Sequence, residues 1–160
     1  MPRTARLLLN NVCYHVITRG NQSKKVFLDN KDFNVYLRLL RKYKLKYKFK
    51  IYAYCLMKNH VHIIIDPKDH NDLSKIMQGL NQSYAIYFNH RYHKNGHLWQ
   101  ERYKSMIIAK DAYFANCLNY IEANPMRAGI AKTLQWYNWS SYKYRISGRR
   151  NRLLDFIDVL

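Results

Sequence analysis

The sequence predicts an α+β fold: a ferredoxin-like split β-α-β antiparallel sheet with an added C-terminal helix. The main observation is the order of apolar periodicities along the 160 residues, which indicates strand, helix, strand, strand, helix, strand, helix. A second observation is the short Lys58–Asn59 turn between the second and third strands, which is typical of a hairpin. We expect such a sheet to carry helices on one face and to leave the other face partly open.

The first half of the chain contains three predicted strands and one helix. Residues 12–18 are rich in β-branched side chains, as a strand is. Asp29 or Asn30 can cap a helix that extends to Tyr47, because apolar residues recur in it at spacings of three, four and seven. Two further strands follow, at residues 51–56 and 61–65.

The second half begins where Asp66–Pro67 interrupts the third strand. Apolar positions from residue 73 to residue 88 form the stripe of an amphipathic helix. A basic loop is expected at residues 91–96, and residues 103–109 predict a fourth strand. Asp111 begins the last predicted helix. This order completes the split β-α-β pattern and adds one helix to it.

Length and charge narrow the class of protein. A chain of 160 residues predicts one domain, placed at residues 1–148, with a short basic-to-apolar tail at residues 149–160. Lys and Arg total 28 against 10 Asp and Glu, a formal charge of +18. Such an excess favours a polyanionic partner, nucleic acid rather than an anionic membrane.

Cysteine spacing and hydropathy predict a location. The three cysteines are far apart and form no C-x-x-C pair, which is typical of a reducing compartment. No apolar stretch approaches the roughly 20 residues that a membrane span needs. The basic start of the chain precedes only three leucines, too few for a signal peptide. We therefore expect a cytoplasmic protein.

Two histidines one residue apart enter the third predicted strand. Because side chains alternate along a strand, His60 and His62 share a face while Val61 points into packing. Two imidazoles about 7 Å apart at the backbone can share one divalent ion. The same pair also suits packing or surface chemistry, so the spacing by itself leaves both interpretations open.

The last predicted helix carries a candidate nucleophile. Tyr120 and Asn124 stand four residues apart and share a helix face, and Pro125 ends or kinks the helix there. If this face crosses the histidine strand, Asn124 supplies an oxygen ligand and the Tyr120 phenol lies beside the metal. An ionised phenol can attack phosphorus and stay covalently attached. The alternative is that Tyr120 is a core residue.

Several separated segments together resemble one family. The segment from Tyr54 to His62 resembles the HUH motif (His, hydrophobic, His) of single-tyrosine transposases, in particular their branch linked to repeated extragenic palindromes (REP). The likeness continues in order at residues 14–21, 96–105, 120–129 and 139–142. Lys58 departs from the proline common before the Asn-His pair, and Ala123 replaces a larger apolar residue. Neither change removes a catalytic group.

The resemblance implies a metal-dependent DNA transposase that acts on single-stranded DNA beside a hairpin. It implies that His60 and His62 bind a divalent metal ion, Mg²⁺ or Mn²⁺, with Asn124 as a polar third ligand. It also implies that Tyr120 is the nucleophile, which leaves a covalent 5′-phosphotyrosine and a free 3′-hydroxyl. Members of the family work as monomers or as homodimers, with the site built in cis or in trans.

DNA is the expected partner, and basic residues are the candidate contacts. These are Arg3, Arg6, Arg19, Arg102, Lys104 and Arg127. For each of them a solvated or structural role is an equal alternative. Trp99 is a candidate for stacking on a base or wedging against a hairpin, with a core role as its alternative.

Two other functions stay open from the sequence. A non-catalytic module could bind single-stranded nucleic acid on the open sheet face, although such sheets carry aromatic residues where this one has His60 and His62. The other is an HUH nickase for replication initiation, against which the single small domain counts. Covalent capture of DNA separates catalysis from binding, and joining of cleaved ends separates a transposase from a nickase.

Overall fold

The computed structural model describes residues 9–109 and 111–156. At its centre is a four-stranded sheet of order β2-β3-β1-β4, in which every neighbouring pair is antiparallel. The strands are β1 (Cys13–Arg19), β2 (Lys50–Met57), β3 (His60–Asp66) and β4 (Lys104–Ile108). One helix follows β1 and another follows β3, which is the split β-α-β arrangement. The predicted fold class is therefore confirmed.

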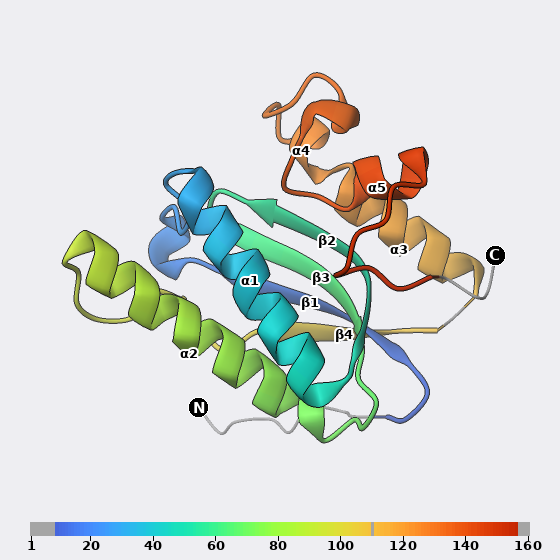
Figure 1. Cartoon of the computed structure of the whole chain (residues 1–160), viewed down its shortest axis with the longest axis horizontal. Coiled ribbons are helices and arrows are strands. Elements are labelled where there is room, and N and C mark those ends of the chain that lie inside the picture. Colours follow the sequence, from blue (N-terminus) through green and yellow to red (C-terminus); the bar gives the residue numbers. More distant parts are fainter. Residues whose placement is uncertain (1–8, 110, 157–160) are drawn as a thin grey trace.

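Helices lie on both faces of the sheet (Figure 1). α1 (Asn30–Tyr47) and α2 (Asp72–Tyr92) pack together on one face, and α3 (Ala112–Glu122) lies on the other. The short helices are η1 (Asn21–Ser23), α4 (Asn124–Arg127), η2 (Leu134–Trp136) and α5 (Tyr142–Ser147). α3 thus occupies part of the face that we expected to be open, because its apolar side chains need burial as much as those of α1 and α2 do.

Alternation along β1 divides its side chains between two cores. Tyr14 belongs to the larger core below α1 and α2, whereas Cys13 belongs to the smaller core below α3. Aromatic rings fill the centre of the larger core, where Phe27, Tyr36 and Tyr84 contact one another with ring centroids 5.3 to 5.5 Å apart. Burial of such large side chains is the main stabilising term for a domain of this size.

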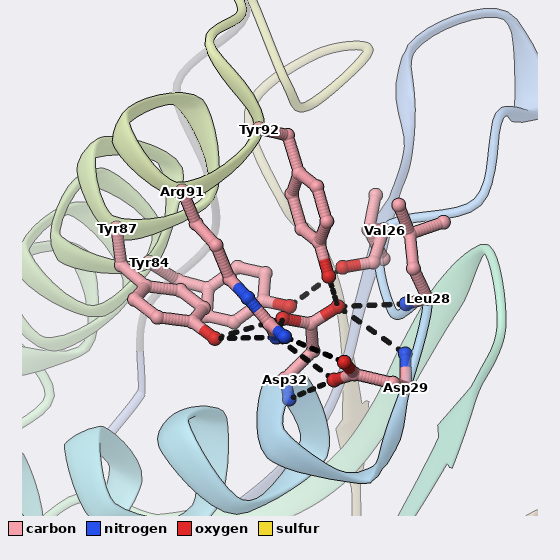
Figure 2. A network of polar contacts seen from close by, with 8 residues as sticks. All are labelled: Val26, Leu28, Asp29, Asp32, Tyr84, Tyr87, Arg91 and Tyr92. Carbon is pink, nitrogen blue, oxygen red and sulfur yellow. Dashed lines mark hydrogen bonds and ion pairs between the residues drawn. The ribbon is translucent and has the colours of Figure 1, made fainter.

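A polar cluster fixes the start of α1 to the end of α2 (Figure 2). Asp29 and Asp32 form a capping box at the start of α1, where the sequence predicted Asp29 as a cap. Arg91 donates to both carboxylates, at 2.6 Å to Asp29 and 2.7 Å to Asp32. Tyr87 and Tyr92 also donate to Asp32, at 2.8 and 2.7 Å. Every polar atom of the buried Asp32 carboxylate is therefore paired.

The smaller core covers only part of its face. α3 buries Phe114, Leu118 and Ile121 against residues of β2 such as Tyr52. On β4, Met106 pairs with a β1 residue of the same face and is 49% exposed. Cys13, His15 and Ile108 are buried, so the β1–β4 half of this face is open at Met106 and Lys104.

A buried ion pair holds α3 to the C-terminal segment. The Glu122 carboxylate is almost fully buried and accepts hydrogen bonds from Arg145 of α5 at 2.5 Å and from Ser141 at 2.6 Å. The main-chain N–H of Ser141 donates to the Tyr54 carbonyl on β2 at 3.0 Å. These contacts tie the helix that carries Tyr120 to the sheet of its own chain.

Some boundaries differ from the predicted ones. α2 continues to Tyr92, so the basic loop expected at 91–96 begins later, because the last turn of α2 is held by the Asp32 cluster. The helix break expected near Pro125 is present: α3 ends at Glu122, and α4 begins at Asn124 and includes Pro125. Within the segment expected as a tail, Leu153 is buried and Asp155 forms an ion pair with α1. No described helix has the length and apolar character to span a membrane.

Candidate active site

The two predicted histidines lie side by side on β3, and a third histidine joins them. The ring centroids of His60 and His62 are 4.9 Å apart. From the neighbouring strand β1, His15 places its Nε2 atom 2.9 Å from Nδ1 of His62. Sequence reasoning gave His15 no role. The available signal was a polar residue inside an otherwise apolar strand, but its contact with β3 depends on the strand register.

Hydrogen bonds at Nδ1 leave the outer nitrogens of the pair available. Nδ1 of His60 lies 2.6 Å from the side-chain oxygen of Asn59, which only accepts, so Nδ1 carries the proton and Nε2 carries a lone pair. Nδ1 of His62 faces His15, and when it donates to His15 the Nε2 atom of His62 is likewise unprotonated. Metal-binding histidines have this arrangement, with the second nitrogen held by a neighbour. The donor set therefore fits a divalent ion.

Burial and charge keep these imidazoles neutral. Desolvation lowers the pKa of His15 to about 4. Desolvation, followed by the neighbouring His60, His15 and Arg19, lowers the pKa of His62 to about 3. The pKa of His60 is lowered as well, by desolvation and by Arg19. Neutral imidazole is the form that binds a metal, so no proton has to leave first.

Tyr120 of α3 reaches this cluster. Its ring centroid is 6.5 Å from that of His62, with the two rings nearly perpendicular. The side chain is 46% exposed, so Tyr120 is not a core residue. On its other side the guanidinium carbon of Arg127 lies 4.4 Å from the ring centroid. The structure thus brings together His60, His62, Tyr120 and Arg127, which the sequence singled out separately.

Asn124 is the first residue of α4, two residues beyond the end of α3. Its amide nitrogen donates to the carbonyls of Tyr120 and Ile121, both at 3.2 Å. The amide oxygen is therefore directed away from the helix carbonyls, as a ligand oxygen must be. Among the described residues no group of three or more His, Cys, Asp or Glu side chains is placed to hold a metal. No hydrogen bond among the described residues joins Asn124 to His60 or His62, so its role as third ligand stays a prediction.

The basic candidates on the described part of the chain gather beside the histidines. Arg19, Arg102 and Lys104 line one hollow of about 200 Å³ on the open half of the sheet face. In the sheet register Arg19 is opposite His60, and Lys104 is opposite a β1 residue that pairs with His62. Arg3 and Arg6 lie outside the described residues.

Trp99 has the core role that was its alternative. Its side chain is buried, its indole N–H donates to the Asn81 carbonyl at 3.0 Å, and its ring packs against Tyr84. Trp136 is 83% exposed instead, and its neighbour Tyr137 is anchored to the Leu56 carbonyl of β2 at 2.6 Å, near the His60 end of the sheet.

A split β-α-β sheet with a histidine pair on a central strand, faced by a tyrosine on the following helix, has the architecture of the single-tyrosine transposases. The family profile described as "Transposase IS200 like" matches residues 9–124, and the chain belongs to this family. The resemblance found in the sequence is thereby confirmed.

Two individual relatives are named as REP-associated tyrosine transposases. The chain is 24% identical over 112 residues to a Haemophilus influenzae protein assigned as a REP-associated tyrosine transposase, and the alignment spans 60% of each protein. Its structure resembles that of a REP-associated tyrosine transposase bound to a REP hairpin, with a TM-score of 0.77 and 19% identity over 99% of this chain and 90% of that one. The solved structure of a Deinococcus radiodurans protein assigned as a transposase is also similar. Its TM-score is 0.52, with 18% identity over 76% of this chain and 96% of that one.

Proposed function

We propose that this protein is a metal-dependent transposase that cleaves and rejoins single-stranded DNA beside a hairpin. Membership of the IS200-like transposase family supports DNA cleavage and joining as the reaction class. The observation that carries the assignment of residues is the contact between Tyr120 and His62, whose ring centroids are 6.5 Å apart although they come from α3 and β3. A half-exposed phenol beside two neutral histidines suits chemistry at a phosphate.

Three atoms would hold the divalent ion, Mg²⁺ or Mn²⁺. They are Nε2 of His60, Nε2 of His62 and Oδ1 of Asn124. When bound, such an ion polarises a phosphate and neutralises part of its charge. Asn59 and His15 act through the ligands, because their contacts with Nδ1 orient the two rings.

Tyr120 performs the covalent step. After it loses its proton, its oxygen forms a bond to phosphorus while the bond from phosphorus to the 3′-oxygen breaks. The leaving 3′-oxygen keeps the electron pair and takes up a proton, so a 3′-hydroxyl is released and the 5′-phosphate stays on Tyr120. Attack by a 3′-hydroxyl of another end reverses these bonds and joins the strands. Arg127 adds positive charge beside the phosphate.

The open half of the sheet face suits a single strand of DNA. Arg19, Arg102 and Lys104 supply cations next to the histidines, and Trp136 supplies an exposed ring for stacking. The solved relative is bound to a REP hairpin, which supports a hairpin as the neighbouring element. The net charge favours DNA over a membrane as partner.

The attachment of α3 supports a monomer that completes its site in cis. Glu122 and Ser141 join α3 to the sheet of the same chain, so Tyr120 reaches His62 without a second copy. The wide spacing of the three cysteines, with no C-x-x-C pair, supports a reducing, cytoplasmic location.

Labelled single-stranded DNA flanking a hairpin, incubated with Mg²⁺ or Mn²⁺, tests the reaction. We expect an adduct that survives denaturant, and its loss on chelation. His60→Ala or His62→Ala should abolish cleavage while retaining most DNA binding, since affinity comes from many phosphate contacts. Binding without an adduct would indicate the non-catalytic module, and an adduct without joining would indicate a nickase. Undiminished cleavage by both variants would contradict the metal site.

A further inference from the structure

A second hollow, on the α2 side of the 96–103 loop, has the lining of a base-binding site. It lies between this loop and α2 and has a volume of about 700 Å³. Four of its polar side chains are amides: Gln78, Asn81, Gln82 and Gln100. Met77, Leu98 and Trp99 give it an apolar wall. We refer to this hollow as the amide groove.

One polar atom of the amide groove lacks a partner. Oδ1 of Asn81 is buried, and within residues 9–109 and 111–156 no donor reaches it. The rest of Asn81 is engaged, since Nδ2 donates to Thr18 Oγ1 at 3.4 Å and the carbonyl accepts from the Trp99 indole at 3.0 Å. A buried acceptor that lacks a donor is unfavourable. A donor from a bound molecule would relieve this cost.

The lining matches the surface of a nucleobase. A base has apolar faces and polar edges, and unpaired bases are recognised by stacking and by hydrogen bonds to those edges. Amide side chains read base edges well, as in the pairing of Asn or Gln with adenine. Because Asn81 offers an acceptor, bases with an exocyclic amino group (adenine, cytosine and guanine) fit it better than thymine, whose single edge donor, N3–H, lies between two carbonyl oxygens that the amide oxygen repels.

The amide groove continues from the candidate active site. Gln100, Glu101 and Arg102 line both this groove and the hollow that contains Arg19. The main-chain N–H of Gln100 donates to the Arg19 carbonyl at 2.9 Å, and Arg19 is opposite His60 in the sheet. A strand that passes from the histidines over Arg19 and Arg102 therefore reaches the amide groove.

We propose that the amide groove binds one unpaired nucleobase with an exocyclic amino group, from the same single strand that is bound at the candidate active site. The groove then helps to select the DNA sequence that is cleaved. This inference rests on the proposed function and names a recognition element for it.

The test is a selection from a randomised pool of single-stranded DNA, with metal withheld so that bound DNA stays intact. The unmodified protein should enrich adenine, cytosine or guanine over thymine at one unpaired position. Asn81→Leu and Gln82→Ala should lose that preference and keep the others. Asn34→Ala is the matched control, because Asn34 is an exposed amide on α1 outside the groove. Gln82 is exposed, so its truncation tests the groove even if Asn81→Leu fails to fold.

Affinity for the selected DNA provides the second measurement. Removing the base at the enriched position should weaken binding by the unmodified protein about tenfold, and binding by the groove variants less than twofold. Identical enrichment and identical losses in both groove variants would overturn the inference. Failure of the proposed function has a different signature, the absence of a covalent adduct when metal is present. A protein that binds no DNA from the pool would overturn both.

Discussion

Two buried polar clusters in this protein differ in how completely their own chain satisfies them. In the cluster around Asp32, Tyr87 and Arg91 donate to Oδ1, while Tyr92 and two main-chain N–H groups donate to Oδ2 (Figure 2). In the histidine cluster, contacts with Asn59 and His15 engage only Nδ1 of the two β3 histidines. No hydrogen bond within the described residues engages their Nε2 atoms.

This difference indicates that the Asp32 cluster stabilises the fold and that the histidine cluster takes part in the reaction. A carboxylate whose lone pairs are all used holds two helices together and has little capacity left for a ligand. Imidazoles that are buried, neutral and oriented, but unsatisfied at one nitrogen, keep that nitrogen for something outside the chain. Damage to the Asp32 cluster should therefore reduce stability, whereas damage to the histidine cluster and its tyrosine should reduce reactivity.

The largest effect is expected from Tyr120→Phe. The variant keeps the ring against His62 and removes only the attacking oxygen, so the rate of adduct formation should fall about a thousandfold or more. DNA affinity and melting temperature should change little. Tyr113→Phe, seven residues earlier on α3, is the matched control and should react normally. An adduct that persists in Tyr120→Phe would assign the nucleophile to another residue, which peptide mapping would identify.

The opposite result is expected from Asp32→Ala. Its carboxylate is fully buried, and its removal leaves Tyr87 and Tyr92 without their acceptor and Arg91 with Asp29 alone, at a cost of about 3 kcal/mol or more. Urea unfolding measures this loss. Adduct yield per folded molecule should stay the same, and Asp69→Ala, at an exposed carboxylate, should change stability by less than about 1 kcal/mol. Lost reactivity in folded Asp32→Ala would break the division between the two clusters.

The sequence predicted the fold because each element has its own local signal. Apolar periodicity located all four strands and the three long helices, and Asp29 and Pro125 marked where α1 begins and where α3 gives way to α4. The end of α2 was predicted less well, because its last turn depends on bonds to Asp32 from a distant helix. Local patterns do not contain that information.

The candidate site likewise has features that local sequence patterns predict and features that depend on contacts between distant segments. Strand alternation placed His60 and His62 on one face, whereas helix spacing only allowed Tyr120 to meet them, and the family resemblance was needed to propose that it does. The role of His15 depends on the register between β1 and β3, and the burial of Trp99 depends on the packing of α2. The roles of His60, His62 and Asn124 as metal ligands, and of Tyr120 as nucleophile, stay predictions.

His15 sharpens the comparison, because it is a buried polar residue whose proposed task is to orient a ligand. His15→Phe removes the acceptor for Nδ1 of His62, so Mn²⁺ affinity measured by electron paramagnetic resonance should fall about tenfold to a hundredfold. His15→Gln retains an acceptor oxygen and should restore part of that affinity. Cleavage by His15→Phe should need more metal but approach the normal maximal rate. Equal metal affinity in both variants would limit His15 to packing.

The smallest effect concerns pH, and its direction also distinguishes the clusters. An unfolded histidine binds a proton with a pKa near 6.5, whereas burial lowers the pKa of His15 to about 4 and that of His62 to about 3. Between those values the unfolded chain binds more protons, so stability should fall as the pH falls below 6.5, by at most about 1.4 kcal/mol per pH unit for each histidine.

Urea unfolding of the metal-free protein between pH 7 and pH 5 measures this slope. His15→Phe should reduce it, because one of the three histidines with a lowered pKa is gone and His62 loses a neighbour that lowers its pKa. Asp32→Ala should lower the whole curve, because it removes the acceptor for Tyr87 and Tyr92. Stability that rises on acidification would mean that the histidines are protonated in the folded protein, and the neutral cluster required for metal binding would then be wrong.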